Sequence, residues 1–195
     1  MNQQDRAVTP VISTILMVAI VIILATTVSV FFLGVVEDIN EPAPNVADTT
    51  GEFTTADGPA GNRQFVRITH IAGDDVDVEE IEIIVRASGP DDDLPTEARL
   101  VNLPGDGYFT GSLDNSNIEG NDDLIDQGPT AGGQIIVVDD SNVWSAGKTI
   151  QFRIAVTGAD FREPPKSDNP NADELEVIIV HTPSNAIIFE HTFRP

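Results

Sequence analysis

Residues 11–33, VISTILMVAIVIILATTVSVFFL, decide the architecture of this chain. They lie within a longer stretch, residues 7–36, that carries no charge. A helix rises about 1.5 Å per residue, so this segment is long enough to cross the roughly 30 Å hydrocarbon core of a bilayer. It exceeds the apolar region of a secretory signal, which holds about 7–15 residues, and bulky Phe31 and Phe32 stand where a small-residue cleavage site would lie. We therefore expect one membrane-spanning helix that is kept on the protein.

The charge of the chain lies almost entirely after this helix. Among 195 residues, 32 are acidic and 10 are basic, which gives a formal net charge of -22. Nucleic-acid binding is excluded because it requires clustered Lys and Arg. At molar salt the Debye length falls to about 3 Å and self-repulsion is screened, so this acidity indicates a halophilic source. The chain has no cysteine, which excludes disulfides and thiolate metal sites.

The segment before the helix is short and polar. Residues 1–7, MNQQDRA, end in the charged pair Asp5 and Arg6, and the positive-inside rule places this end in the cytoplasm. Pro10 suits the first turn of a helix, where a missing N–H costs nothing. Gly34 is expected to end the helix. Residues 37–62 are predicted to be linker and loop, with one short strand at 52–55.

The N-terminal motif resembles that of haloarchaeal type IV pilins and pilin-like proteins. The resemblance rests on residues 5–12, DRAVTPVI, followed by residues 14–20, TILMVAI. It implies that a prepilin peptidase cuts on the cytoplasmic side between Ala7 and Val8, so that Arg6, Ala7 and Val8 form the processing site. The mature helix, residues 8–36, would then be the assembly core, with copies of this chain or other pilins as partners. Bacterial pilins carry a glutamate at the fifth mature position, and this chain has Ile12 there. An archaellin is a related alternative that the motif resembles less closely.

The helix has two stable surroundings, lipid or a bundle of copies, because both hide its apolar surface from water. Small residues allow close helix contact, and no Gly-x-x-x-Gly motif is present. The candidates for the assembly face are Ser13, Ala19, Ala25, Thr26 and Ser29. The helix by itself leaves a filament subunit and a plain membrane anchor both open.

Residues 63–195 are predicted to form an acidic, external, all-β antiparallel sandwich. Alternating and β-branched segments predict strands at 64–72, 79–87, 134–138, 148–157, 174–182 and 186–193, with a hairpin turn at 183–185. Long loops are expected at 88–97, 104–133 and 158–173. Residues 68–76, ITHIAGDDV, and residues 143–147, VWSAG, also resemble segments of haloarchaeal pilin-domain proteins.

The sequence holds no motif that indicates catalysis or a cofactor. It has no nucleophile elbow, no P-loop and no dinucleotide fingerprint. His70, His181 and His191 lack metal-ligand spacing and are interpreted as strand histidines. The acidic clusters are weak candidates for cation binding, and no metal site is predicted; they comprise Asp91, Asp92, Asp93, Asp122, Asp123 and Asp126.

These observations favour a non-enzymatic subunit of a type IV pilus-like filament, used for adhesion or surface contact. The alternative is a single-pass protein with an external binding domain that never polymerises. An anchored hydrolase has no supporting constellation of residues.

Overall fold

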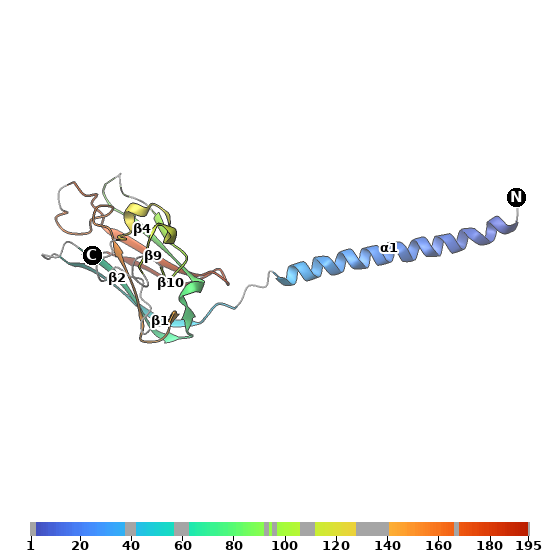
Figure 1. Ribbon diagram of the computed structural model, residues 1–195, viewed down its shortest axis with the longest axis horizontal. Helices are drawn as coiled ribbons and strands as arrows, with labels where there is room; N and C mark the ends of the chain where they lie inside the picture. Colours follow the sequence, from blue (N-terminus) through green and yellow to red (C-terminus); the bar gives the residue numbers. More distant parts are fainter. Residues whose placement is uncertain are drawn as a thin grey trace. The chain divides into compact units, whose positions relative to one another are not determined.

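The computed structural model describes residues 3–37, 42–56, 63–91, 94, 97–105, 112–127, 141–165 and 168–194. The chain divides into two units, Met1–Glu41 and Pro42–Pro195 (Figure 1). The first unit is helical and the second is built from strands. This division confirms the predicted fold class of one N-terminal helix followed by an antiparallel β domain.

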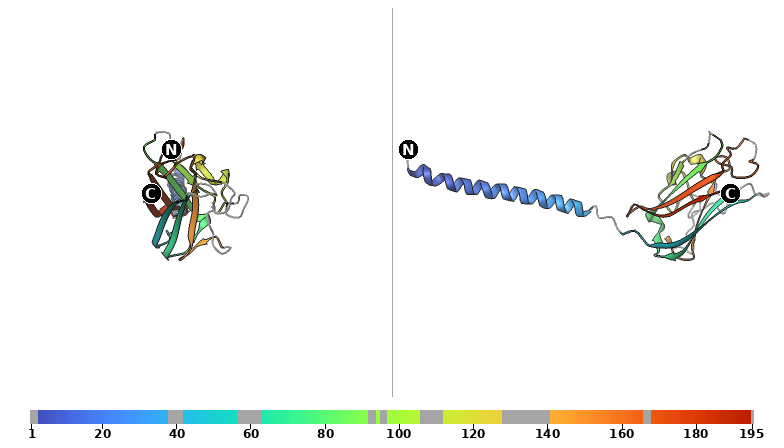
Figure 2. Two further views of the ribbon diagram at one scale, coloured as in Figure 1. Left: turned by 90° about the vertical axis from the view of Figure 1, so that its left-hand side faces the viewer. Right: turned by 180° about the vertical axis from the view of Figure 1, so that it is seen from behind.

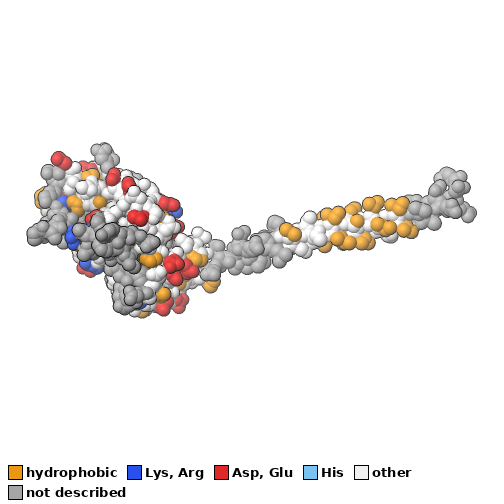
Figure 3. All heavy atoms as spheres, in the orientation of Figure 1, with side chains coloured by type: hydrophobic (Ala, Val, Ile, Leu, Met, Phe, Trp, Pro, Cys, Tyr) orange, Lys and Arg blue, Asp and Glu red, His pale blue; other side chains and the backbone are white. Residues whose placement is uncertain are grey.

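The first unit contains a single helix, α1 (Gln3–Glu37). All residues from 11 to 30 are exposed, and Figure 3 shows the apolar side chains on the face of this span that is in view. A helix satisfies its backbone groups within its own segment, which suits an apolar stretch rich in Val and Ile. α1 is longer than predicted at both ends. Pro10 lies inside it and not in its first turn, and Gly34 does not end it, because a glycine costs a helix only about 1 kcal/mol.

The second unit contains two larger sheets and one small ribbon. The three-stranded sheet has the order β1 (Val46–Ala56), β2 (Arg63–Gly73) and β8 (Thr149–Ile154). The five-stranded sheet has the order β10 (Ala186–Phe193), β9 (Glu174–His181), β4 (Ile81–Ser88), β5 (Glu97–Leu100) and β6 (Ile118–Gly120). The ribbon pairs β3 (Val76–Asp77) with β7 (Val143–Trp144), and all of these strand pairs are antiparallel.

Short 3-10 helices connect several strands of this unit. They are η1 (Val78–Glu80), η2 (Asn115–Asn117) and η3 (Asp122–Leu124). Figure 2 shows the unit from two further directions, and its described residues form no α-helix. A sandwich-like domain made from strands alone agrees with the sequence, because its apolar residues recur with a period of two.

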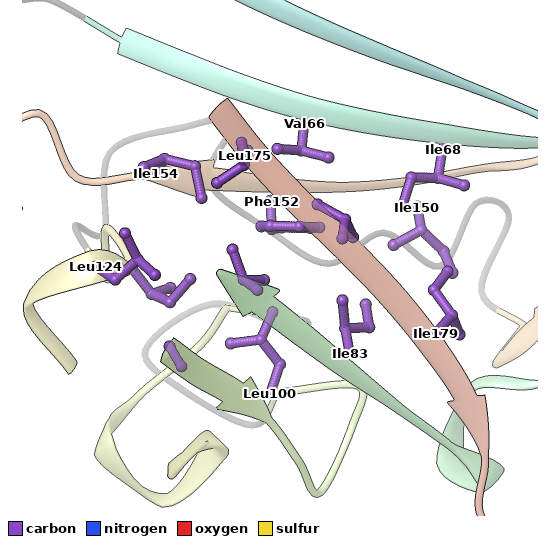
Figure 4. Packing of buried hydrophobic residues seen from close by; sticks show 14 of the residues in the cluster. Val66, Ile68, Ile83, Leu100, Leu124, Ile150, Phe152, Ile154, Leu175 and Ile179 are labelled. Carbon is purple, nitrogen blue, oxygen red and sulfur yellow. The ribbon is translucent and has the colours of Figure 1, made fainter. Parts of the chain in front are cut away.

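Alternation along the strands builds the core. In β2 the side chains of Gln64, Val66, Ile68 and His70 point inward and are buried, while their neighbours are partly exposed. β4 repeats the pattern. Figure 4 shows how the inward side chains of the two larger sheets meet, and each buried aliphatic or aromatic side chain contributes about 1.5–3 kcal/mol. The labelled members are Val66, Ile68, Ile83, Leu100, Leu124, Ile150, Phe152, Ile154, Leu175 and Ile179.

Most of the predicted strands are present in the structure. The strand predicted at 186–193 has the observed bounds of β10, and those at 64–72, 79–87, 148–157 and 174–182 correspond to β2, β4, β8 and β9. The predicted turn at 183–185 joins β9 to β10. The strand predicted at 134–138 lies outside the described residues.

Two regions differ from the prediction. Residues 37–62 were predicted to be linker and loop, but β1 occupies 11 of them and pairs with β2 along its whole length, with Phe53 opposite Val66. Thr and Phe suit a partly buried strand once a partner is present, which explains its extension beyond 52–55. The strand β6 lies inside the loop predicted at 104–133, and β5 begins at the last residue of the loop predicted at 88–97 and was not predicted as a strand, because both strands are short and charged.

Candidate assembly site

The exposed part of α1 is the first component of the site. Residues Val11–Val30 form a 20-residue span with a mean hydropathy of 2.8 and no buried residue, so the helix is long and apolar enough to cross a membrane. An apolar helix exposed on all sides is not stable in water, because burial contributes about 25 cal/mol per Å². Lipid or other helices must therefore cover it.

The hydroxyl groups of this span bond within the helix. Thr26 Oγ1 donates to the carbonyl oxygen of Ile23 at 2.8 Å, and Ser29 Oγ donates to that of Ala25 at 2.8 Å. Thr27 makes the same kind of bond. A hydroxyl satisfied in this way can lie in an apolar environment without a partner from another helix. These positions can therefore contribute to contact with a neighbouring helix through the close packing of small side chains.

Four of the five predicted assembly residues share one side of α1. Successive residues are rotated by about 100°, which places Ala19, Ala25, Thr26 and Ser29 within about one third of the circumference. Ser13 falls outside this arc, so it does not belong to the same stripe. We call Ala19, Ala25, Thr26 and Ser29 the small-residue stripe. The predicted processing residues Arg6, Ala7 and Val8 lie near the start of α1 in helical backbone.

The start of the β domain is fixed by a reciprocal pair of hydrogen bonds. The backbone N–H of Asn45 donates to Asp74 Oδ2 at 2.9 Å, and the backbone N–H of Asp74 donates to the carbonyl oxygen of Asn45 at 3.0 Å. Gly73 makes this approach possible: its φ is +135°, and an added Cβ would lie 2.3 Å from the Asn45 oxygen. We call Asn45, Gly73 and Asp74 the linker clamp, since they hold the first residues after the helical unit against the end of β2.

The two segments singled out in the β region contact each other beside this clamp. His70 is fully buried, and its Nδ1 lies 3.1 Å from the carbonyl oxygen of Trp144. The two rings are 5.1 Å apart, and the backbone N–H of Gly147 donates to the carbonyl oxygen of His70 at 2.7 Å. The β3–β7 ribbon adds the pair Val76 and Trp144. Residues 68–76 and 143–147 therefore form one packed unit at the end of the domain where the linker begins.

The three histidines lie in strands, as predicted. His70 belongs to β2, His181 ends β9 and His191 lies in β10. His181 Nδ1 is 2.7 Å from Ser184 Oγ in the hairpin turn, and its Nε2 is 3.5 Å from Glu80. These contacts indicate that His181 stabilises the β9–β10 hairpin.

The weak cation candidates do not come together in the part of the chain that the structure describes. Asp91 accepts the backbone N–H of Asn171 at 2.7 Å, and Asp126 pairs with buried Arg153 at 2.9 Å. Asp122 and Asp123 lie exposed in η3, while Asp92 and Asp93 lie outside the described residues. Among the described residues no group of three or more metal-ligating side chains is found.

The pKa values of two surface groups are shifted. The hydroxyl and then the backbone N–H of Ser116 stabilise the carboxylate of Asp114 and hold its pKa below the ordinary value. Hydrogen bonds from Arg86 to Glu97 and Glu176 raise the pKa of that arginine. Both groups are structural: the first caps η2, and the second ties β4 to β5 and β9.

A buried polar network escaped the sequence analysis. Asp160 is fully buried and pairs with Arg162, and its carboxylate also accepts from the backbone N–H of Arg162. Gln64 donates to the carbonyl oxygen of Ala159 at 2.6 Å and accepts the N–H of Phe161 at 2.8 Å. The only sequence signal was the polar Gln64 at an inward position of a strand. The network fixes residues 159–162 against β2.

Comparison with known families identifies the helical part of the site. Residues 6–47 match the family model described as archaeal type IV pilin, N-terminal. The N-terminal segment is similar to the N-terminal region of archaeal type IV pilins. This pilin segment covers nearly all of α1 and continues to the clamp residue Asn45 and the first residues of β1. A comparison of the chain with curated proteins gives no match.

Proposed function

We propose that this chain is a structural subunit of a type IV pilus-like surface filament. In this proposal a prepilin peptidase cuts between Ala7 and Val8, and the mature subunit polymerises through residues 8–36. The observation that carries the proposal is the similarity of residues 6–47 to archaeal type IV pilins, in a segment whose helix residues 11–30 are all exposed. That surface requires lipid before assembly and neighbouring helices after it.

The position of Pro10 supports the predicted cut. In the uncut helix Pro10 has no N–H to donate to the carbonyl of Arg6. After a cut before Val8, Pro10 would be the third residue of the mature chain, where the N–H groups have no helical partner anyway. Processing would thus remove a local weakness of the helix at the junction that the resemblance implies.

The proposed route begins in the membrane. Arg6 would keep the N-terminus cytoplasmic, and the acidic β domain would stand outside the cell. Assembly would then move the helix from lipid into the filament core, with the small-residue stripe at the closest helix contacts. The β domains would cover the filament surface, where they would serve adhesion or contact with other surfaces.

A second candidate function is a single-pass anchor that carries an external binding domain. The observation that favours it is the length of the apolar span, which alone suffices to hold one chain in a bilayer. In this case the leader would be retained and the chain would remain a monomer in the membrane.

Matched substitutions on α1 distinguish the two functions. Ser29→Leu fills the small-residue stripe, whereas Ser13→Leu makes the same chemical change on another side of the helix. If the chain polymerises, sheared surface material from cells with a pilus assembly system should contain wild-type and Ser13→Leu polymers, and Ser29→Leu should reduce them strongly. Membrane levels of all three should be equal. Recovery of the wild type solely as detergent-extractable single chains would contradict polymerisation and support the anchor.

A further inference from the structure

The outer face of the three-stranded sheet differs in charge from the rest of the domain. We call it the arginine face, after Arg67 at its centre. The three strands β1, β2 and β8 carry Arg63, Arg67 and Arg153 against two acids, Asp48 and Glu52; Arg153 is buried and paired with Asp126, so it adds no charge to the face. The five-stranded sheet carries two arginines against six glutamates, which are Glu82, Glu97, Glu119, Glu174, Glu176 and Glu190. In a chain of net charge -22, the three-stranded sheet is therefore unusual, because its strands carry no excess of acidic residues.

Arg67 has no carboxylate partner among the described residues. Its Nε donates to Gln151 Oε1 at 2.8 Å, its Nη1 donates to Thr54 Oγ1 at 3.4 Å, and its guanidinium carbon lies 5.1 Å from the ring centre of Phe65. Glu52 is its cross-strand neighbour in register, yet the guanidinium bonds to neutral groups. Among the described residues Arg67 therefore forms no ion pair, on a protein with threefold more acids than bases.

The arginines on the five-stranded sheet contrast with Arg67. Arg86 bonds to Glu97 and Glu176 at 2.8 and 3.0 Å, and Arg99 lies 3.5 Å from Glu82. These guanidinium groups are already neutralised within the fold. Among the described residues no carboxylate does the same for Arg67, and a partner could supply one from outside.

The arginine face is also held in place before any partner binds. Gln151 and Thr54 fix Arg67 from both neighbouring strands, and Thr69 Oγ1 lies 2.7 Å from Thr149 Oγ1. Ordering these side chains would cost little on binding, since they are already tethered. Arginine and aromatic residues are enriched in protein interfaces, and Lys, Asp and Glu are depleted there. The composition of this face fits a protein-binding surface.

We propose that the arginine face binds the acidic rim of a second copy of this chain in the filament, an inference that rests on the proposed function. The acidic rim is the run of five acids in residues 74–80, which comprises Asp74, Asp75, Asp77, Glu79 and Glu80. Within its own domain the carboxylates of this rim accept hydrogen bonds mainly from neutral donors; for example, Asn142 Nδ2 donates to Glu79 Oε1 at 2.8 Å. Copies in a filament repeat in one orientation, so their contacts join two different patches of the surface. A cationic face and an anionic rim meet that requirement.

Charge reversal in the full chain tests this contact. Arg67→Glu should reduce sheared filaments about tenfold or more, because it sets a carboxylate against the acidic rim. Arg99→Glu is the matched control, with the same change on the five-stranded sheet, and should change the yield less than twofold. Membrane level and thermal unfolding of the detergent-solubilised full chain establish that each variant is folded. Arg67→Gln, which removes the charge but keeps a polar side chain, covers the case in which Arg67→Glu fails to fold.

The outcomes separate this inference from the proposed function. Recovery of filaments when Asp75→Arg is added to Arg67→Glu would establish the rim as the partner. Normal filaments from folded Arg67→Glu and Arg67→Gln would overturn the inference while leaving the pilus subunit intact. The same holds if these variants form normal filaments but the cells attach poorly to acidic surfaces, since the face would then bind another partner. Absence of wild-type filaments would instead overturn the proposed function.

Discussion

The linker clamp makes Gly73→Ala an informative substitution. Gly73 has φ of +135°, a conformation that side chains rarely adopt. The added Cβ would lie 2.3 Å from the Asn45 carbonyl oxygen and 2.7 Å from the Ala47 nitrogen, and both are backbone atoms. The substitution should therefore displace residues 45–47 from the end of β2 and break the two hydrogen bonds between Asn45 and Asp74.

The magnitude follows from these two contributions. Backbone strain at such a φ costs about 1–3 kcal/mol. Each lost hydrogen bond adds about 0.5–1.5 kcal/mol. The free energy of unfolding should fall by about 3–5 kcal/mol in total. For a domain of this size 1 kcal/mol corresponds to about 2–4 °C in Tm, so a decrease of about 10 °C is expected.

Gly147→Ala provides the control. Gly147 also has a positive φ, +88°, but an added Cβ meets nothing within 4 Å. This substitution should cost strain alone, about 1–2 kcal/mol, or about 4 °C in Tm. Thermal unfolding of the full chain in detergent, followed by the circular dichroism of the β domain, measures both. Equal decreases in Tm for the two alanine variants would contradict a stabilising role of the linker clamp, because the loss of its hydrogen bonds would then cost nothing beyond backbone strain.

Three further predictions test the rest of the domain. Asp160→Asn should lower the free energy of unfolding by about 3–5 kcal/mol in chemical denaturation, since it leaves Arg162 buried without its counter-charge; a loss below 1 kcal/mol would contradict this. Ser116→Ala should raise the pKa of Asp114 in a carboxyl NMR titration, because a hydrogen bond to the charged form is removed. The lowered pKa means that Asp114 stabilises the fold at neutral pH and that this contribution is lost as the pH falls through its folded pKa, so an unchanged titration would disprove the assignment. Phe152→Ala should cost about 3–5 kcal/mol in the same denaturation assay, because Phe152 is fully buried between the two sheets, and a near-neutral effect would argue against that core.

The parts of the fold that the sequence could predict are those governed by local patterns. The helix follows from one uninterrupted apolar segment, and β2, β4, β9 and β10 follow from alternation or β-branched runs. The ends of α1 were predicted less well, because helix-ending signals such as Gly34 are weak beside a continuing apolar run. The length of β1 was underestimated because a segment with several threonines and one phenylalanine forms a strand only when it pairs with β2.

The site was predictable only in part for a similar reason. The pilin-like motif is contiguous, so its residues could be named from the sequence. The linker clamp joins residues 29 positions apart, and the contact of His70 with Trp144 spans 74 positions. No local pattern specifies such pairs. Asp160 and Arg162 are close in sequence, but their burial depends on how residues 159–162 fold against β2.

The central claim is that this chain is processed as a prepilin and assembled through its helix. The most direct test is the identity of the N-terminal residue in protein recovered from sheared surface material and from membranes. We predict Val8 as the first residue of the polymer, with the seven leader residues removed. A polymer or membrane protein that still begins with the intact leader would contradict it.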